Sequence, residues 1–169
     1  MEVPLDRPET ADEISFASFF SDEYEGLYRT LLLMVGSRSE ADDLAQEAMA
    51  RVYERWGRVR AMASPAGYAY MVAFNLNHRR IRRLALGRRH TAADPEPAPA
   101  TDQAEARHDV RSAIARLPLK LREAVVVTTW LDMPAEQAGR VLGVRPATVR
   151  GRVHRARKLL RDQLEDVDG

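Results

Sequence analysis

The chain has 169 residues, no cysteine and a net charge of +1. The lack of cysteine excludes disulfide bonds, thiolate zinc sites and a redox-active thiol. With 45% hydrophobic and 30% charged residues, it is expected to form one ordinary domain or two small ones. Residues 1–13 have no apolar segment typical of a secretory signal, and the apolar run Leu31–Val35 is too short to cross a bilayer. A cytoplasmic protein is therefore expected.

The charges are segregated along the chain. Residues 1–75 hold 7 basic and 13 acidic side chains, whereas residues 76–93 hold six arginines and no acid. Residues 94–110 hold one basic and five acidic side chains, and residues 111–169 hold 12 basic and 7 acidic ones. Two basic blocks separated by acidic ones indicate contact with a polyanion at two places.

The N-terminal half has helical periodicity throughout. Residues 16–35 predict one or two apolar helices, and residues 40–56 predict an amphipathic helix because apolar residues recur in steps of three and four. Ser39 followed by Asp42 resembles a capping box and predicts the start of this second helix. The turn at Ser64 and Pro65 predicts a further helix whose C-terminal half is rich in arginine.

A proline-rich segment divides the chain. Residues 90–104 contain three prolines and few large apolar residues, a composition typical of a flexible, solvated linker. Beyond it, one helix is predicted to stop at Pro118 and another to follow at 119–131. Residues 125–130, VVVTTW, resemble a strand in isolation, but their place between helical segments argues against one. An all-α fold is expected.

The C-terminal segment has the pattern of a helix-turn-helix. Pro134 suits the first turn of a short helix, Gly143 suits its end, and Pro146 opens a second helix after a short turn. In this arrangement the second helix enters the DNA major groove.

The second helix of this pair carries five arginines and a lysine between residues 144 and 160. At about 100° per residue, one face is apolar and the centre of the opposite face is small. The apolar face holds Val149, Val153, Ala156 and Leu160, and the opposite centre holds Ala147, Gly151 and His154. A glycine inside a helix costs about 1 kcal/mol relative to alanine. Close approach of the helix to a groove floor explains why a glycine stands at position 151 in spite of this cost. A solvated basic helix is the alternative. The preceding short helix and the small outward centre favour DNA binding.

The candidate DNA-binding residues of this helix and the turn before it are Arg145, Thr148, Arg150, Gly151, Arg152, His154, Arg155 and Lys158. Arginines here are suited to phosphates or to guanine edges.

Two separate signatures together resemble one family. Residues 41–56, ADDLAQEAMARVYERW, combine with LPLKLREAVVV at 117–127 and the helix-turn-helix that ends in HRARKLL. This combination resembles the extracytoplasmic-function (ECF), group 4, sigma factors of the sigma-70 family. The resemblance covers about residues 14–165. It implies two small helical domains, a sigma-2 helical bundle and a sigma-4 helix-turn-helix, joined by a flexible linker.

The domain boundaries that follow are a disordered N-terminus at 1–13, sigma-2 at 14–89, the linker at 90–104 and sigma-4 at 105–165. The resemblance implies binding to core RNA polymerase and promoter-specific initiation by reading −10 and −35 elements. The implied partners are core polymerase, promoter DNA and an anti-sigma factor.

The implied polymerase-binding residues are Asp42, Asp43, Leu44, Gln46, Glu47 and Arg51. From the residues alone, an ordinary solvated helix face explains these acids better.

The implied −10 residues follow on the next helix. They are Tyr68, Tyr70, Phe74, Asn75, Arg79, Arg80, Arg82 and Arg83. Exposed aromatic rings can stack on unpaired bases, but core packing is the stronger reading for Tyr70 and for Phe74 taken singly. The arginines are better candidates, as phosphate contacts. The loop Gly57–Ala66 falls where the family captures a flipped −10 base.

Four positions depart from the family pattern. Arg145 replaces the usual Ser or Thr that caps the recognition helix, Arg79 replaces a common acid, and the small Ala138 and Gly139 are expected to thin the packing of the preceding helix. These changes leave the fold intact and put the preferred promoter sequences in doubt.

No other chemistry is indicated by the sequence. The four histidines are scattered and no nucleophile elbow or phosphate-binding glycine loop is present, so no enzyme, metal or cofactor is expected. Two rival functions remain. A DNA-binding regulator acting without polymerase predicts neither polymerase binding nor strand melting. A sigma-mimicking interaction protein predicts that substituting Arg150 and Arg155 leaves its activity unchanged.

Overall fold

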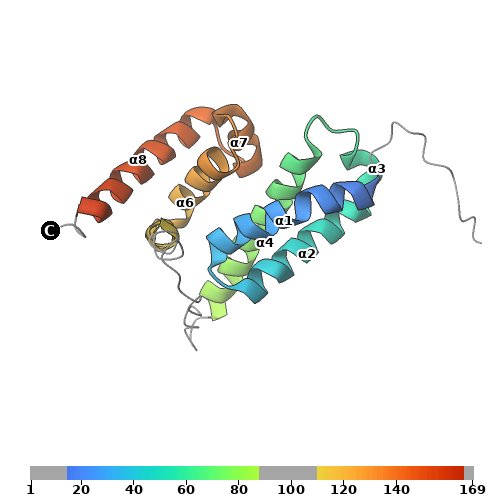
Figure 1. Ribbon diagram of the computed structural model, residues 1–169, viewed down its shortest axis with the longest axis horizontal. Helices are drawn as coiled ribbons and strands as arrows, with labels where there is room; N and C mark the ends of the chain where they lie inside the picture. Colours follow the sequence, from blue (N-terminus) through green and yellow to red (C-terminus); the bar gives the residue numbers. More distant parts are fainter. Residues whose placement is uncertain (1–14, 88–109, 166–169) are drawn as a thin grey trace, which may run out of the picture.

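The computed structural model describes residues 15–87 and 110–165 (Figure 1). Within these two ranges every regular element is helical, which confirms the expected all-α fold. The expected disordered N-terminus at 1–13 and linker at 90–104 lie outside the described residues.

The N-terminal half consists of α1 (Phe16–Val35), α2 (Arg38–Glu54), α3 (Trp56–Val59) and α4 (Pro65–Gly87). Residues 16–35 form a single helix rather than two. Ser64 opens α4 as predicted, because its Oγ accepts a hydrogen bond from the Gly67 amide at 3.0 Å.

The predicted cap of α2 is wrong by two residues. Ser37, not Ser39, precedes the helix, and its side chain accepts from the Glu40 amide. Ser37 and Glu40 match the capping box with the usual glutamate, whereas Ser39 and Asp42 lie inside the helix. Gly36 ends α1 immediately before, with φ of 76°, so two residues suffice for the turn between the helices.

The core of this half forms where α1, α2 and α4 meet. From α1 come Leu27 and Leu31, and from α4 comes Phe74, all of them buried. The buried face of α2 is built largely from alanine, with Ala41, Ala45 and Ala48 fully enclosed. Small residues allow α1 and α4 to approach α2 closely.

The C-terminal half has a helix at 110–116, α6 (Leu119–Val125), a π-helical turn η1 (Val126–Trp130), α7 (Ala135–Leu142) and α8 (Pro146–Glu165). The strand-like VVVTTW segment is helical, as its position predicted. Leu117 and Pro118 separate the first two helices of this half, and α7 and α8 form the predicted helix-turn-helix.

The two halves pack directly against each other. Val126, Val127 and Met133 belong to the same cluster of buried side chains as Leu31 and Phe74. Helix α7 contacts α4, while α6 and η1 contact α1 (Figure 1). In this structure the two halves that correspond to the two expected domains share one apolar interface.

Among the described helices, none is both long and apolar enough to cross a membrane.

Candidate nucleic-acid interface

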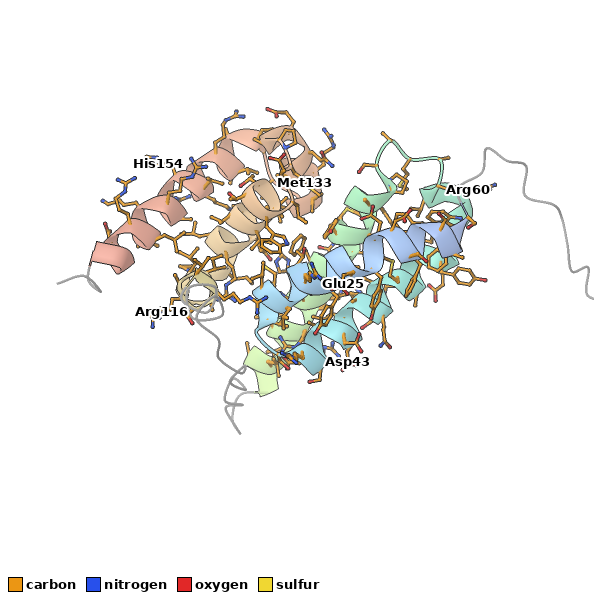
Figure 2. All side chains as sticks on the ribbon, viewed as in Figure 1. Glu25, Asp43, Arg60, Arg116, Met133 and His154 are labelled. Atoms are coloured by element: carbon orange, nitrogen blue, oxygen red, sulfur yellow. The ribbon has the colours of Figure 1, made fainter. Side chains whose placement is uncertain are left out.

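Helix α8 presents the surface that the sequence assigned to DNA. Val149 and Ala156 are fully buried and pack α8 against the rest of the protein. Ala147 and His154, on the opposite side by helical spacing, are exposed, and Figure 2 shows His154 on the outer side of the helix. A Cβ added at Gly151 meets nothing within 4 Å. Gly151 therefore has no packing role within the described chain, and the centre of the outward face is open to a ligand.

The basic side chains of α8 surround this small centre. Arg150, Arg155 and Lys158 are exposed, and Arg152 is half-buried. Arg150 contacts Glu136 of α7 at 3.2 Å, with both side chains more than 60% exposed. A surface ion pair contributes at most about 1 kcal/mol, so Arg150 can exchange Glu136 for a phosphate.

The turn before α8 corrects one expectation. Gly139 does not thin the packing, because the backbone of the turn occupies the space where its side chain would lie. A Cβ at Gly139 would come within 2.7 Å of the Val144 carbonyl oxygen. Gly143, with φ of 65°, adopts the left-handed conformation that ends α7. The close turn sets the position of α8 against α7.

Arg145 begins α8 through its backbone. Its carbonyl accepts hydrogen bonds from the amides of Thr148 and Val149 at 2.9 and 3.2 Å. Its side chain is exposed and lies beside the candidate DNA-binding face. Thr148, which follows Ala147 in the first turn of α8, is half-buried.

On α4, Tyr70 and Phe74 belong to the core. Phe74 is 2% exposed and Tyr70 is 6% exposed. The Tyr70 hydroxyl points toward α1, where a Cβ at Gly26 would lie 3.2 Å from it. Burial raises the pKa of Tyr70. Both rings therefore pack in the core, which was the alternative to base stacking, and neither is available to stack on a base in this structure.

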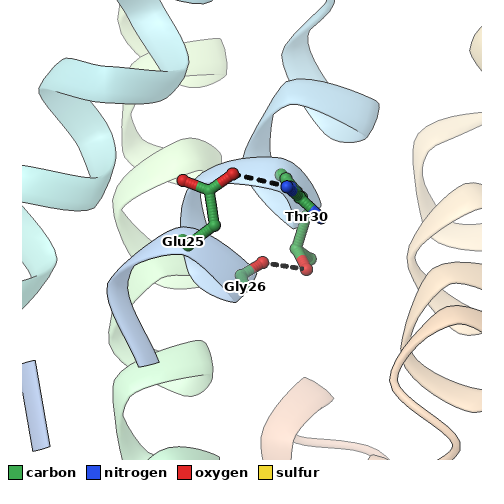
Figure 3. A network of polar contacts seen from close by, with 4 residues as sticks. Glu25, Gly26 and Thr30 are labelled. Carbon is green, nitrogen blue, oxygen red and sulfur yellow. Dashed lines mark hydrogen bonds and ion pairs between the residues drawn. The ribbon is translucent and has the colours of Figure 1, made fainter. Parts of the chain in front are cut away.

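The segment of α1 beside Tyr70 is shaped by local polar contacts (Figure 3). Buried Thr30 donates from its hydroxyl to the Gly26 carbonyl at 2.8 Å. On the exposed side, Arg29 donates to Glu25 at 2.7 Å. The first contact satisfies the buried hydroxyl within its own helix, and the same hydroxyl also makes a side-chain hydrogen bond with Tyr70 across the core.

A groove between α2 and α4 brings together five of the predicted residues from both helices. It is lined by Glu47, Ala50, Arg51, Glu54, Arg55, Tyr68, Met71, Val72, Asn75 and Arg79. Tyr68, Asn75 and Arg79 of the predicted −10 set thus share one surface with Glu47 and Arg51 of the predicted polymerase set. Asn75 and Arg79 are exposed, and Tyr68 is half-buried.

Arg55 is a groove residue that sequence reasoning missed. Its Nη1 donates to the Tyr68 hydroxyl at 3.3 Å and so joins the end of α2 to α4. Arg55 follows Glu47 and Arg51 in steps of four, a spacing that could have placed it on the same face of the helix.

Arg80 differs from the other predicted arginines of α4. It forms an ion pair with Glu40 of α2 and is only 21% exposed. Arg82 and Arg83 are exposed near the end of the helix. Arg80 therefore ties two helices together, while Arg79, Arg82 and Arg83 remain accessible.

The outer face of α2 is only partly available to a partner. Leu44 is 6% exposed and packs in the core, so it cannot serve as a direct contact in this structure. Asp42 accepts hydrogen bonds from Tyr24 at 2.6 Å and from Gln46 at 2.8 Å. Burial and this bond to Asp42 raise the pKa of Tyr24 to about 12. Asp43 is exposed (Figure 2) and sits between these residues in sequence.

Farther along this face, Glu47 forms an ion pair with Arg51 at 2.6 Å. Both side chains are at least 40% exposed, so the pair contributes little stability and leaves both groups accessible.

Nothing in the described residues forms a group of three or more side chains that could hold a metal ion.

Comparison with known proteins identifies the family. Residues 19–87 match Sigma-70 region 2, and residues 107–160 match Sigma-70, region 4. The ECF RNA polymerase sigma factor SigM of Mycobacterium tuberculosis is 30% identical over 150 residues, which cover 88% of this chain and 76% of that protein. The chain belongs to the ECF sigma factors. Members of this family are non-catalytic factors that direct promoter-specific transcription initiation, as the resemblance implied.

Other ECF sigma factors are similar over much of their length. SigW of Bacillus subtilis is 27% identical, with 92% of each chain covered. SigE of Mycolicibacterium smegmatis is 32% identical over 147 residues, which span 82% of this chain but 57% of that relative. A solved structure of the sigma factor RpoE, in complex with the anti-sigma factor NepR from Bartonella quintana, covers 89% of this chain and 96% of its own with a TM-score of 0.74. At 18% identity it shows a shared fold.

Proposed function

We propose that this ECF sigma factor binds core RNA polymerase through the exposed face of α2 and reads promoter DNA with α4 and α8. The observation that carries the proposal is the outward face of α8, where a Cβ at Gly151 would meet nothing within 4 Å and the nearby Arg150 and Arg155 are exposed. A helix with a small centre and basic edges can approach a groove floor while its arginines reach phosphates and base edges.

The proposed polymerase-binding residues are Asp43, Gln46, Glu47 and Arg51, with Asp42 orienting Gln46. The proposed −10 residues are Tyr68, Asn75, Arg79, Arg82 and Arg83, and the loop Gly57–Ala66 is the proposed base-capture loop. For the −35 element we propose Arg145, Thr148, Arg150, Gly151, Arg152, His154, Arg155 and Lys158. Tyr70, Phe74, Leu44 and Arg80 are left out because the core or an ion pair engages them.

The proposed function assigns a role to each part of the chain. We propose residues 14–89 as sigma-2, 90–104 as a linker and 105–165 as sigma-4, acting in the cytoplasm without catalytic activity of their own. An anti-sigma factor is a proposed partner, supported by the RpoE relative that was solved with one.

Reconstituted transcription with core polymerase on a promoter library tests the proposal. We expect promoter-dependent transcripts, and we expect Arg150→Ala to reduce them by about 5- to 150-fold because an arginine contact to guanine discriminates by about 1–3 kcal/mol. Arg161→Ala is the matched control, since Arg161 is exposed near the end of the same helix and outside the proposed site.

Each rival function predicts a different result. A regulator independent of polymerase would bind DNA without binding core, and a sigma-mimicking protein would tolerate loss of Arg150 and Arg155. The proposal is wrong if neither core binding nor a promoter-dependent transcript is detected.

A further inference from the structure

Arg122 joins the two halves of the molecule. Its Nη1 donates to the carbonyl of Met34, in the last turn of α1, at 2.6 Å. The same guanidinium donates to the carbonyls of Ile114, Ala115 and Leu117. Carbonyls in the last turn of a helix lack helical partners, and a cation there is favourable to the helix dipole. One side chain of sigma-4 thus caps a helix of its own half and α1 of sigma-2.

The next residue makes a second polar contact across the interface. Glu123 is 2% exposed, and its carboxylate pairs with the Nε2 of His78 on α4. A buried carboxylate is costly unless it is paired. His78 is 34% exposed, so the partner that compensates the buried charge remains within reach of solvent.

Asn77, beside His78 on α4, adds a further cost. It is fully buried, and neither polar atom of its side-chain amide has a hydrogen-bond partner within the described chain. A buried amide without a partner loses its hydrogen bonds to water and gains none within the protein, which destabilises the fold. Asn77 is therefore a cost to the fold of α4, and at the contact between α4 and α6 it is the buried Glu123 carboxylate that favours opening, while the apolar contacts hold the interface shut.

The closed arrangement does not suit a bipartite promoter. Elements centred at −10 and −35 are separated by about 25 base pairs, or about 85 Å at 3.4 Å per step. In the structure α7 contacts both α4 and α8. Packed helices lie 8–10 Å apart, which brings α8 to within about 20 Å of α4 at their closest approach. Reading both elements at once requires the halves to separate.

We propose that the contact of α6 with α1 and α4, through Arg122, Glu123 and His78, is a reversible latch that holds the free chain closed and opens on the promoter. This inference rests on the proposed function, because only a two-element reader has to open. The latch keeps the two DNA-binding surfaces from engaging a promoter together before the chain is assembled on polymerase.

The stability of the closed form is expected to depend on pH through His78. The hydrogen bond to Glu123 raises the pKa of His78, against burial and the nearby charges of Arg82 and Lys120, which lower it. A raised pKa means that the closed state favours the protonated imidazole. Its stabilisation is fully present below the ordinary pKa of about 6.5 and is lost as the pH rises through the higher, closed-state value. We expect more of the open form at pH 9 than at pH 6.

The test measures the distance between two spin labels in the full-length chain. The protein has no cysteine, so Arg38→Cys and Arg116→Cys, both exposed and close to the Arg122 contact, place one label in each half. We expect a short, narrow distance distribution for the free chain at pH 6, a shift of population to long distances at pH 9, and long distances in the promoter complex with core polymerase.

Two variants probe the pair itself. His78→Glu sets a second carboxylate against Glu123 and is expected to give long distances already at pH 6. Glu123→Gln keeps the shape but removes the charge, and is expected to abolish the pH response. Glu25→Gln is the matched control, because it removes one carboxylate from an exposed site on α1 (Figure 3) and should respond to pH as the parent chain does.

A pH response that survives in Glu123→Gln would overturn the latch, as would short distances that persist in a transcribing promoter complex. If His78→Glu fails to fold, as judged by circular dichroism, the Glu123→Gln result decides. A chain that shows these distance changes but supports no transcription would contradict the proposed function instead, and with it the role given to the latch.

Discussion

Gly139 illustrates how a neighbouring backbone decides what a single position can hold. In the sequence it replaces a common alanine and suggests loose packing. In the structure the Val144 carbonyl lies where a Cβ would be, and the Val144 amide donates to the Gly139 carbonyl at 2.9 Å. Burial decides similarly at Leu44, Tyr70 and Phe74, whose side chains point into the core.

We expect Gly139→Ala to destabilise the protein by about 1–3 kcal/mol, because the added methyl group must displace a backbone carbonyl rather than a mobile side chain. Thermal unfolding measures the effect. Gly57→Ala is the control, since a Cβ there meets nothing within 4 Å. Equal stability of the two variants would contradict the close contact.

At the scale of elements, α8 combines an ordinary buried face with an outward centre where Ala147 and Gly151 are small and His154 is exposed. Val149 and Ala156 anchor the helix, and these positions could be predicted because helical periodicity is a local property. The groove beside α4 could not be predicted in the same way. It depends on α2 and α4 lying side by side, which brings Arg55 to Tyr68.

Gly151→Ala separates stability from DNA binding. We expect it to stabilise the chain by up to about 1 kcal/mol, since alanine is the better helix former and there is open space for its methyl group. We expect the same change to weaken transcription from promoters that depend on the −35 element. Unfolding and promoter-titration experiments measure the two effects. Unchanged promoter affinity would show that the helix does not approach the groove closely at this residue.

At the scale of the whole molecule, the shared interface makes the two halves one structural unit in the closed form. Buried residues of α7 and η1 join the same apolar cluster as α1, α2 and α4. Arg122 reinforces that interface with hydrogen bonds to both halves.

We expect the free chain at pH 6 to unfold in a single cooperative transition, with equal calorimetric and van't Hoff enthalpies. Arg122→Met removes the hydrogen bonds of the guanidinium while keeping an apolar stem, and should lower the melting temperature and separate the unfolding of the two halves. Differential scanning calorimetry distinguishes these outcomes. Two transitions in the parent chain would contradict a shared core.

Much of the fold and part of the site were predictable. The helical class, the ends at Pro118 and Gly143, and the helix-turn-helix follow from periodicity and from residues with restricted backbones. The outward centre of α8 also follows from residue spacing. The cap of α2 was misplaced because Ser37 and Ser39 offer competing starts that only hydrogen-bond geometry separates.

By itself, the sequence determined the helices, their buried faces and the family, because these depend on neighbours within one or two helical turns and on motifs read in order. Only the tertiary structure decided which predicted residues remain accessible and how the halves meet. The pairing of His78 with Glu123 spans 45 residues, and that of Arg122 with Met34 spans 88. Such contacts leave no periodic trace in the sequence, since they form only when packing brings distant helices together.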